Sequence, residues 1–194
     1  PLMPVILGVT GTGLALLLPP LFPGITVLYV SCVILGLTHL FFMIPIEVGI
    51  GGIGGPEKRA ANYAMLSMGW SIANTIGPIV AGFSIDHIGH VQVFWVLASF
   101  SMLPMLILWI KPDVVPKRPA PAGNDERGSV VDLWRAPSMR TIYITAAVIS
   151  SAQNLFQFYL PIYGHSLGLS ASAIGIILGV VGTAAFVIRS VIPF

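Results

Sequence analysis

Charged residues are scarce in this sequence. Asp, Glu, Lys and Arg make up 8% of its 194 residues, whereas soluble domains carry about 25%. Hydrophobic residues make up 56% and the mean hydropathy is +0.93, so the chain has too little polar surface to cover a soluble core. The composition excludes an ordinary soluble domain and indicates a protein of the lipid bilayer.

Residues that carry enzyme or metal chemistry are also few. Cys32 is the single cysteine, which excludes an internal disulfide, and a net charge of +2 provides no basic surface for nucleic acid. Zinc-spaced Cys and His, phosphate-binding loops and paired acids are not found, so no metal and no cofactor are expected. The Gly-rich residues 49–55 lack the Lys-Ser/Thr ending of a phosphate loop and are interpreted as a flexible cytoplasmic connection.

Long apolar runs dominate the sequence instead. A helix needs about 20 apolar residues to cross a hydrocarbon layer of about 30 Å. Six stretches of near that length predict membrane-spanning helices at residues 2–18, 25–48, 63–85, 91–110, 140–163 and 170–192. The expected fold is therefore all-α, a polytopic bundle of membrane helices. The apolar runs at both ends lead us to expect an excerpt of a longer protein.

The basic residues indicate how the spans are oriented. All nine fall between the second and third spans, between the fourth and fifth, or at the end of the sixth, and Arg59 lies in the first of these loops. Because Lys and Arg near span ends are retained in the cytoplasm, this side is expected to be cytoplasmic, in a multi-pass protein of a bacterial inner membrane. The Pro-rich residues 111–139 are expected to form a cytoplasmic linker.

Small residues recur four positions apart in the third and sixth predicted spans. The two stripes comprise Gly69, Ala73, Gly77 and Ala81, and Ala171, Gly175, Gly179 and Thr183. Small residues at this spacing let two helix backbones approach closely, and Pro78 after Gly77 predicts a kink. Generic packing between membrane helices is the alternative interpretation.

The third span also resembles the antiporter motif of major facilitator transporters. The matching residues are Gly77-Pro78-Ile79-Val80-Ala81-Gly82, preceded by Gly69 and Ala73. Residues 55–60 resemble the P-x-x-R-x-x-A loop of this family, with Arg59 as its Arg, and residues 161–175 are similar to its connection between the seventh and eighth spans. The resemblance implies six helices of a twelve-helix fold, spans three to eight. Residues 1–110 would end the N-terminal half and residues 140–194 would begin the C-terminal half.

The resemblance also implies a function. In that family the fifth and eighth spans pack at the boundary between the two halves, which here would be a seal or hinge for alternating access. It implies a secondary active transporter of small solutes, specifically proton-coupled efflux, with a small solute and protons as partners and a monomer as the favoured state. A proton symporter or a uniporter that imports a small neutral solute is the alternative. Cys32 stands where many members carry Arg, four residues before Gly36, and this departure favours the alternative.

Polar side chains within two predicted spans are candidate substrate contacts. An ionisable group inside a membrane is costly and marks a functional site by default, and His39 in the second span suits a proton-linked step because histidine changes charge near neutral pH. The resemblance assigns Gln153, Asn154 and Gln157 of the fifth span to the substrate cavity. Structural hydrogen bonds between helices are the alternative for all four residues. A membrane-embedded enzyme using His39 and Glu47 is a remote alternative.

Asp86 belongs to a second family-like pattern. Residues 82–89 resemble the G-x-x-x-D-x-x-G loop between the second and third spans of the family, but His90 follows where that loop carries Arg or Lys. The charge pattern also places Asp86 outside. Asp86 is therefore interpreted as a polar turn residue at the outer mouth.

Overall fold

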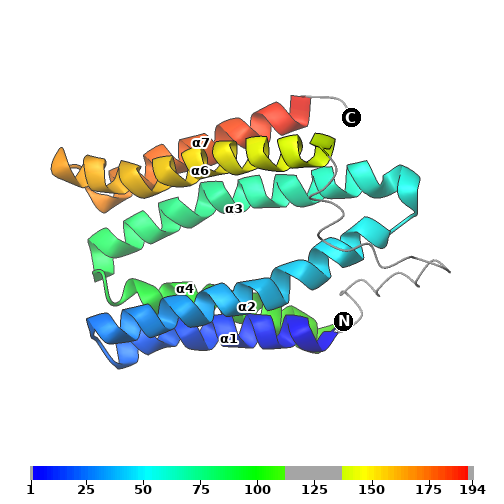
Figure 1. Cartoon of the computed structure of the whole chain (residues 1–194). Helices are drawn as coiled ribbons and strands as arrows, with labels where there is room; N and C mark the ends of the chain where they lie inside the picture. The colour runs from blue at the N-terminus through cyan, green and yellow to red at the C-terminus, as the bar shows by residue number, and fades with distance from the viewer. Residues whose placement is uncertain (1, 112–136, 192–194) are drawn as a thin grey trace. The chain divides into compact units, whose positions relative to one another are not determined.

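The computed structural model describes residues 2–111 and 137–191, and every regular element in these ranges is helical. The elements, drawn in Figure 1, are α1 (Leu2–Leu21), α2 (Ile25–Gly52), the 3-10 turn η1 (Pro56–Lys58), α3 (Arg59–Ile88), α4 (Val93–Ile110), α6 (Pro137–Ser166) and α7 (Ala171–Val191). The predicted all-α membrane fold is confirmed. Most of the predicted linker, residues 112–136, lies outside the described ranges.

Five helical segments in the described ranges are long and apolar enough to cross a membrane: α1, α2, η1 with α3, α4 and α7. The predicted span 140–163 is also helical, because α6 covers it with 30 residues, but α6 is not among the five. The amides Gln153, Asn154 and Gln157 interrupt its apolar run and lower its mean hydropathy. The six predicted spans are therefore all helical, and five of them lie in segments that are long and apolar enough to cross a membrane.

The chain divides into two compact units. The first contains α1 to α4, η1 and α7, and the second contains α6. Within the first unit α1 packs against α2 and α4, while α3 packs along α7. The helix α7 thus finds its partner in an element that ends more than 80 residues earlier in the chain.

Tight contacts along α1 form the small core of the first unit. Val5 and Val9 are buried, and Phe42 of α2 and Leu108 of α4 pack against them. A Cβ added to Gly8 would lie 2.7 Å from the backbone nitrogen of Phe42, so α1 and α2 approach backbone to backbone as small residues in membrane helices allow.

Helix α1 continues through Pro19 and Pro20 to Leu21, beyond the end of the predicted span 2–18. Proline lacks the N–H that would bond the carbonyl four residues earlier, so Pro19 leaves the carbonyl of Ala15 without its intrahelical donor. The hydroxyl of Ser31 in α2 donates to this carbonyl at 2.5 Å, and Ser31 is buried. A side chain of the neighbouring helix thus replaces the missing bond, as is common in membrane helices.

Helices α2 and α3 are longer than their predicted spans. Residues 49–52 belong to α2 and are not part of a flexible connection, and Arg59 is the first residue of α3 and not a loop residue. The 30 residues of α3 give a length of about 45 Å at 1.5 Å per residue. Hydropathy marks where a chain leaves the lipid, but a helix can continue beyond that depth because its backbone bonds are internal.

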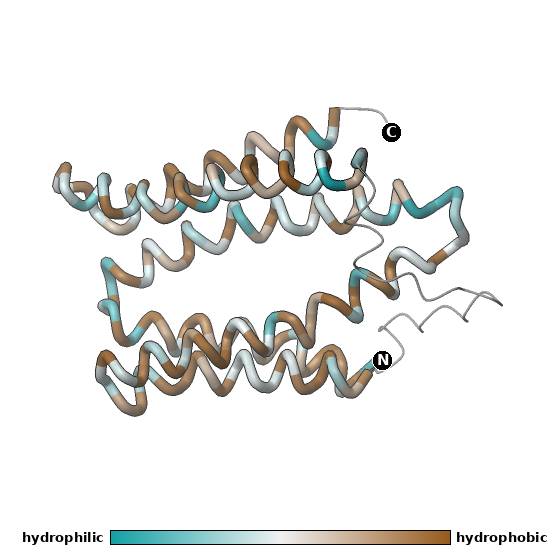
Figure 2. The backbone as a smooth tube through the Cα atoms, viewed as in Figure 1, coloured by the Kyte–Doolittle hydropathy of each residue, from teal (hydrophilic) through white to brown (hydrophobic). Residues whose placement is uncertain are grey.

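Large apolar side chains face outward on the described helices. Trp109 of α4 is 85% exposed and Met65 of α3 is 77% exposed. Figure 2 shows hydrophobic residues along the whole length of α1 and α2, whereas the corner between α2 and α3 is hydrophilic. An apolar surface of this extent is unfavourable in water and suits contact with lipid or with further membrane helices.

Candidate functional site

Helices α3 and α7 pack against each other, and four glycines make their contact close. A Cβ added to Gly175 would meet the carbonyl oxygen of Pro78, and one added to Gly82 would meet that of Ala171. The four glycines are Gly82, Gly175, Gly179 and Gly182, and all are buried. Because the opposing atoms are mostly backbone, no side chain fits at these positions without moving a helix.

The packing face of α3 is not the stripe expected from four-residue spacing. Gly69, Ala73 and Gly77 are exposed, and a Cβ added to Gly69 or Gly77 would have nothing within 4 Å. Ala81 is half-buried. The face that meets α7 contains Ser71, Thr75, Pro78 and Gly82. This face alternates steps of four and three residues, as the 3.6-residue helical repeat requires.

The face of α7 partly matches the expected stripe. Gly175 and Gly179 contact α3, but Thr183 is exposed and Gly182 is buried in its place. A Cβ on Gly182 would lie 2.6 Å from the backbone nitrogen of Thr75. Counting by helical turns instead of fixed fours would have identified Gly182 from the sequence.

Asp86 links α3 to the beginning of α7. Its Oδ1 accepts from the backbone N–H of Ala171 at 3.1 Å, and its Oδ2 accepts from the N–H of Ser172 at 2.8 Å and from the Ser172 hydroxyl at 2.5 Å. Ser170 Oγ accepts the next N–H, from Ala173, at 3.2 Å. The first N–H groups of a helix lack internal partners and carry partial positive charge. Asp86 lies in the last turn of α3 and caps a different helix, so its interpretation as a turn residue is incomplete.

Arg189 links α7 to α3 at the other end of the pair. One guanidinium nitrogen, Nη1, donates to the carbonyl of Ser67 at 2.9 Å and also to the hydroxyl of Ser71. Ser71 is buried, and its hydroxyl donates in turn to the carbonyl of Ser67. A cation in the last turn of α7 also complements the partial negative charge at that helix end. Sequence reasoning counted Arg189 only as a topology marker.

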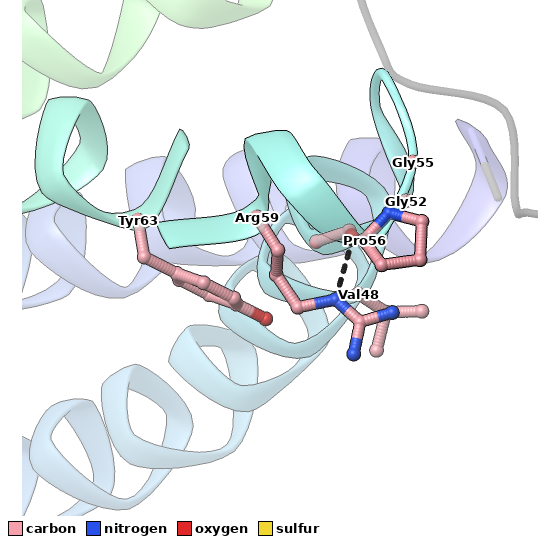
Figure 3. Close-up of a pocket in the computed structure, with 7 residues that line it drawn as sticks. Val48, Gly52, Gly55, Pro56, Arg59 and Tyr63 are labelled. Atoms are coloured by element: carbon pink, nitrogen blue, oxygen red, sulfur yellow. Dashed lines mark hydrogen bonds between the residues drawn. The ribbon is translucent and has the colours of Figure 1, made fainter. Parts of the chain in front are cut away.

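The first turns of α3 cover the end of α2 and border an open pocket (Figure 3). Arg59 Nε donates to the carbonyl of Gly51 at 3.2 Å, and Asn62 Nδ2 donates to that of Ile53 at 2.7 Å. These bonds satisfy carbonyls that the end of a helix leaves unpaired. The pocket measures about 420 Å³ and is lined by Val48, Gly51, Gly52, Gly55, Pro56, Arg59 and Tyr63.

His39 of α2 contacts α3. Its ring meets that of Trp70 edge to face, with centroids 6.4 Å apart and an interplanar angle of 84°. Both side chains are exposed. An edge-to-face aromatic contact favours a defined orientation of the imidazole.

The amides of α6 lie in the second unit and are described there by themselves. Gln153, Asn154 and Gln157 are all exposed, and Gln153 and Gln157 share one face because they are four residues apart. One turn further, Tyr159 and Tyr163 stack with ring centroids 6.2 Å apart. The face that carries Gln153 and Gln157 therefore offers amide donors and acceptors.

Comparison with known protein families decides between a transporter and other membrane proteins. The family model described as Major Facilitator Superfamily matches residues 2–194. The chain belongs to the Major Facilitator Superfamily. No solved structure matches the chain.

Membership of the Major Facilitator Superfamily establishes the broad function. The protein is a multi-pass membrane protein and a secondary transporter of small solutes. Members of this superfamily are transporters and not enzymes, which argues against an enzyme built on His39 and Glu47. In the described ranges, no three His, Cys, Asp or Glu side chains lie close enough together to hold a metal ion.

Proposed function

We propose that this chain comprises spans three to eight of a proton-coupled exporter that works by alternating access. In this assignment α3 is the fifth span, which carries the antiporter motif, and α7 is the eighth. The observation that carries the proposal is the backbone contact of Gly175 with Pro78 inside that motif. This contact brings α3 and α7 close together, as alternating access requires of two helices at the boundary between the two moving halves of a transporter; this boundary is called the α3–α7 seam.

The proposed cargo is a small neutral or amphipathic solute, exported across a bacterial inner membrane. Gln153, Asn154 and Gln157 offer uncharged hydrogen-bonding groups on a membrane helix, and such groups need partners from other helices or from a wet cavity. His39 is the candidate proton-linked group, because an ionisable side chain inside a membrane helix marks a functional site by default and its ring contacts Trp70 of α3.

A uniporter or a proton symporter for a neutral solute is the second candidate. Cys32 favours it, because Cys32 stands in α2 where many exporters of this superfamily carry an Arg associated with proton coupling. The thiol of Cys32 is exposed and provides no fixed positive charge that could interact with a coupling carboxylate. The number of protons moved per solute therefore separates the two candidates.

Proton movement in inverted membrane vesicles tests this proposal. Vesicles from cells that produce the full-length protein would be acidified inside, and a pH-sensitive dye would report the lumen pH while neutral and amphipathic solutes are added in turn. An exporter that exchanges protons raises the lumen pH when its solute enters. Solute entry without a pH rise would contradict antiport and support the uniporter, and a pH fall would support the symporter.

The variant Gly179→Leu is expected to lose transport in the same vesicle assay. Leu would collide with Ile79 and with the carbonyl oxygen of Thr75, which lie 2.7 Å and 3.0 Å from an added Cβ. We expect solute-dependent proton release to fall at least about tenfold at equal protein level. Small displacements of functional groups reduce rates by such factors or more, and Leu would push α3 and α7 apart. Unchanged release would contradict a role for the α3–α7 seam in transport.

A further inference from the structure

Polar contacts between α3 and α7 are concentrated at the two ends of the pair. The Asp86 clasp comprises Asp86 with the N–H groups of Ala171 and Ser172 and the hydroxyl of Ser172. The Arg189 clasp comprises Arg189 with the carbonyl of Ser67 and the hydroxyl of Ser71. Among the described contacts between the clasps, glycines lie against backbone atoms of the partner helix, the side chain of Ile79 and the hydroxyl of Thr75.

The two clasps are separated by nearly the thickness of the hydrocarbon layer of a bilayer. Ser172 and Arg189 are 17 residues apart in one continuous helix, which places them about 26 Å apart along its axis. This separation is close to the hydrocarbon thickness of about 30 Å. In a helix that crosses the bilayer, this separation would place each clasp near a boundary of the hydrocarbon layer, where water can replace its hydrogen bonds, and the glycine contacts between them at the depth of the lipid chains.

In this arrangement the glycine contacts can serve as a pivot. The Asp86 clasp and the Arg189 clasp can then serve as two independent latches, one at each end of the helix pair. Contacts between glycines and backbone are non-directional, so two helices can tilt about them without losing a specific bond. Hydrogen bonds require defined geometry, so tilting that separates one end breaks the clasp at that end. Asp86 is exposed, and its carboxylate can exchange protein donors for water when the end opens.

We propose that Asp86 and Arg189 are positioning residues of the transport cycle, each of which holds α3 and α7 together at one side of the membrane. The Asp86 clasp closes the end that the charge pattern assigns to the outside, and the Arg189 clasp closes the cytoplasmic end. This inference rests on the proposed alternating access. It assigns opposite effects to two residues of the same helix pair, whereas residues that merely stabilise the fold would act in the same direction.

Cysteine labelling in the full-length protein tests the two latches. All native cysteines, Cys32 included, are first replaced by serine. One reporter, Ala171→Cys, lies at the Asp86 clasp, and a second, Ser67→Cys, lies at the Arg189 clasp; both sites are half-buried. A membrane-impermeant maleimide, added to right-side-out and to inverted vesicles, measures how fast each end opens.

We expect Asp86→Ala to raise the labelling rate at Ala171→Cys severalfold and to lower it at Ser67→Cys. Arg189→Gln should do the reverse. The conservative variants Asp86→Asn and Arg189→Lys keep an acceptor and a donor respectively, so their shifts should be smaller in the same directions. They also keep the test usable if the larger changes reduce folding.

Three results would overturn the inference in distinguishable ways. Labelling that changes at both reporters in the same direction would show a loss of fold stability and not two latches. Labelling at both ends of the parent protein without a response to Asp86→Ala and Asp86→Asn would overturn the Asp86 clasp alone. Protection of both reporters in the parent under all conditions would overturn alternating access at this seam, and the latches with it.

Discussion

Proline residues inside membrane helices release carbonyl groups, and α1 shows how one such group is satisfied. Pro19 removes the donor for the carbonyl of Ala15, and the buried hydroxyl of Ser31 takes its place at 2.5 Å. A carbonyl in a membrane helix that loses its own donor depends on a donor from another part of the protein. A single hydroxyl thereby joins α1 to α2 where neither hydropathy nor helix propensity would indicate a specific contact.

Ser31→Ala should lower the free energy of unfolding of the full-length protein in detergent. The change leaves the Ala15 carbonyl buried without a partner, at a cost of about 1–2 kcal/mol. Thermal or chemical unfolding followed by circular dichroism measures the difference. Ser99→Ala is the matched control, because Ser99 is exposed and bonds only to a carbonyl of its own helix. Equal losses for the two variants would show that the bond between the helices is not what stabilises this site.

At the scale of elements, the contact of α3 with α7 depends on which glycines face it. Gly175 and Gly77 are both interior glycines of membrane helices, but only Gly175 has backbone atoms of the partner helix against the place of its Cβ. The same chemical change at the two positions therefore has opposite predicted signs.

Gly175→Ala should destabilise the protein and Gly77→Ala should not. The added methyl group at Gly175 meets the carbonyl oxygen of Pro78, and overpacking of this kind costs about 1–3 kcal/mol. At Gly77 the methyl group meets open space in the described part of the chain, and the better helix propensity of Ala contributes up to about 1 kcal/mol. Unfolding in detergent gives both values, and a loss at Gly77 as large as that at Gly175 would contradict the observed register.

Individual elements were more predictable than the faces they use. Hydropathy located the helices, because the lipid imposes a minimum apolar length on each of them. The packing register of α3 was wrong, because fixed four-residue spacing from Gly69 drifts around a helix of 3.6 residues per turn. The cap formed by Asp86 could not be predicted, because its partners are backbone N–H groups 85 and 86 residues away, and a sequence pattern carries no record of such groups.

At the scale of the whole molecule, the distribution of basic residues predicts the orientation of every helix. Reporter fusions to the full-length protein after Gly24, Gly89 and Gly168 should place alkaline phosphatase outside the cytoplasm, where it is active. A fusion after Gly55, beside Lys58, should be inactive, because Lys and Arg near span ends stay in the cytoplasm. An active fusion at Gly55 would reverse the topology, and it would exchange the two sides assigned to the clasps.

The transporter class could be predicted from the sequence, whereas the amide-rich α6 shows where hydropathy alone is insufficient. Family membership rests on a match along residues 2–194. The residues that would bind cargo stay predictions, because Gln153 and Gln157 become a site only through partners on other helices. Polar groups in a membrane helix mark a need for partners without specifying them.

The separation of α3 from α7 along the chain has a consequence for biosynthesis. Helix α1 meets its partner α2 as soon as the next span is made, but Asp86 and Ala171 are 85 residues apart. At 5–20 residues per second, ribosomes need about 4–17 s to make that segment. During this interval the face of α3 that contains Ser71, Thr75, Pro78 and Gly82 has no α7 to pack against, so it stays open to other partners until α7 is made.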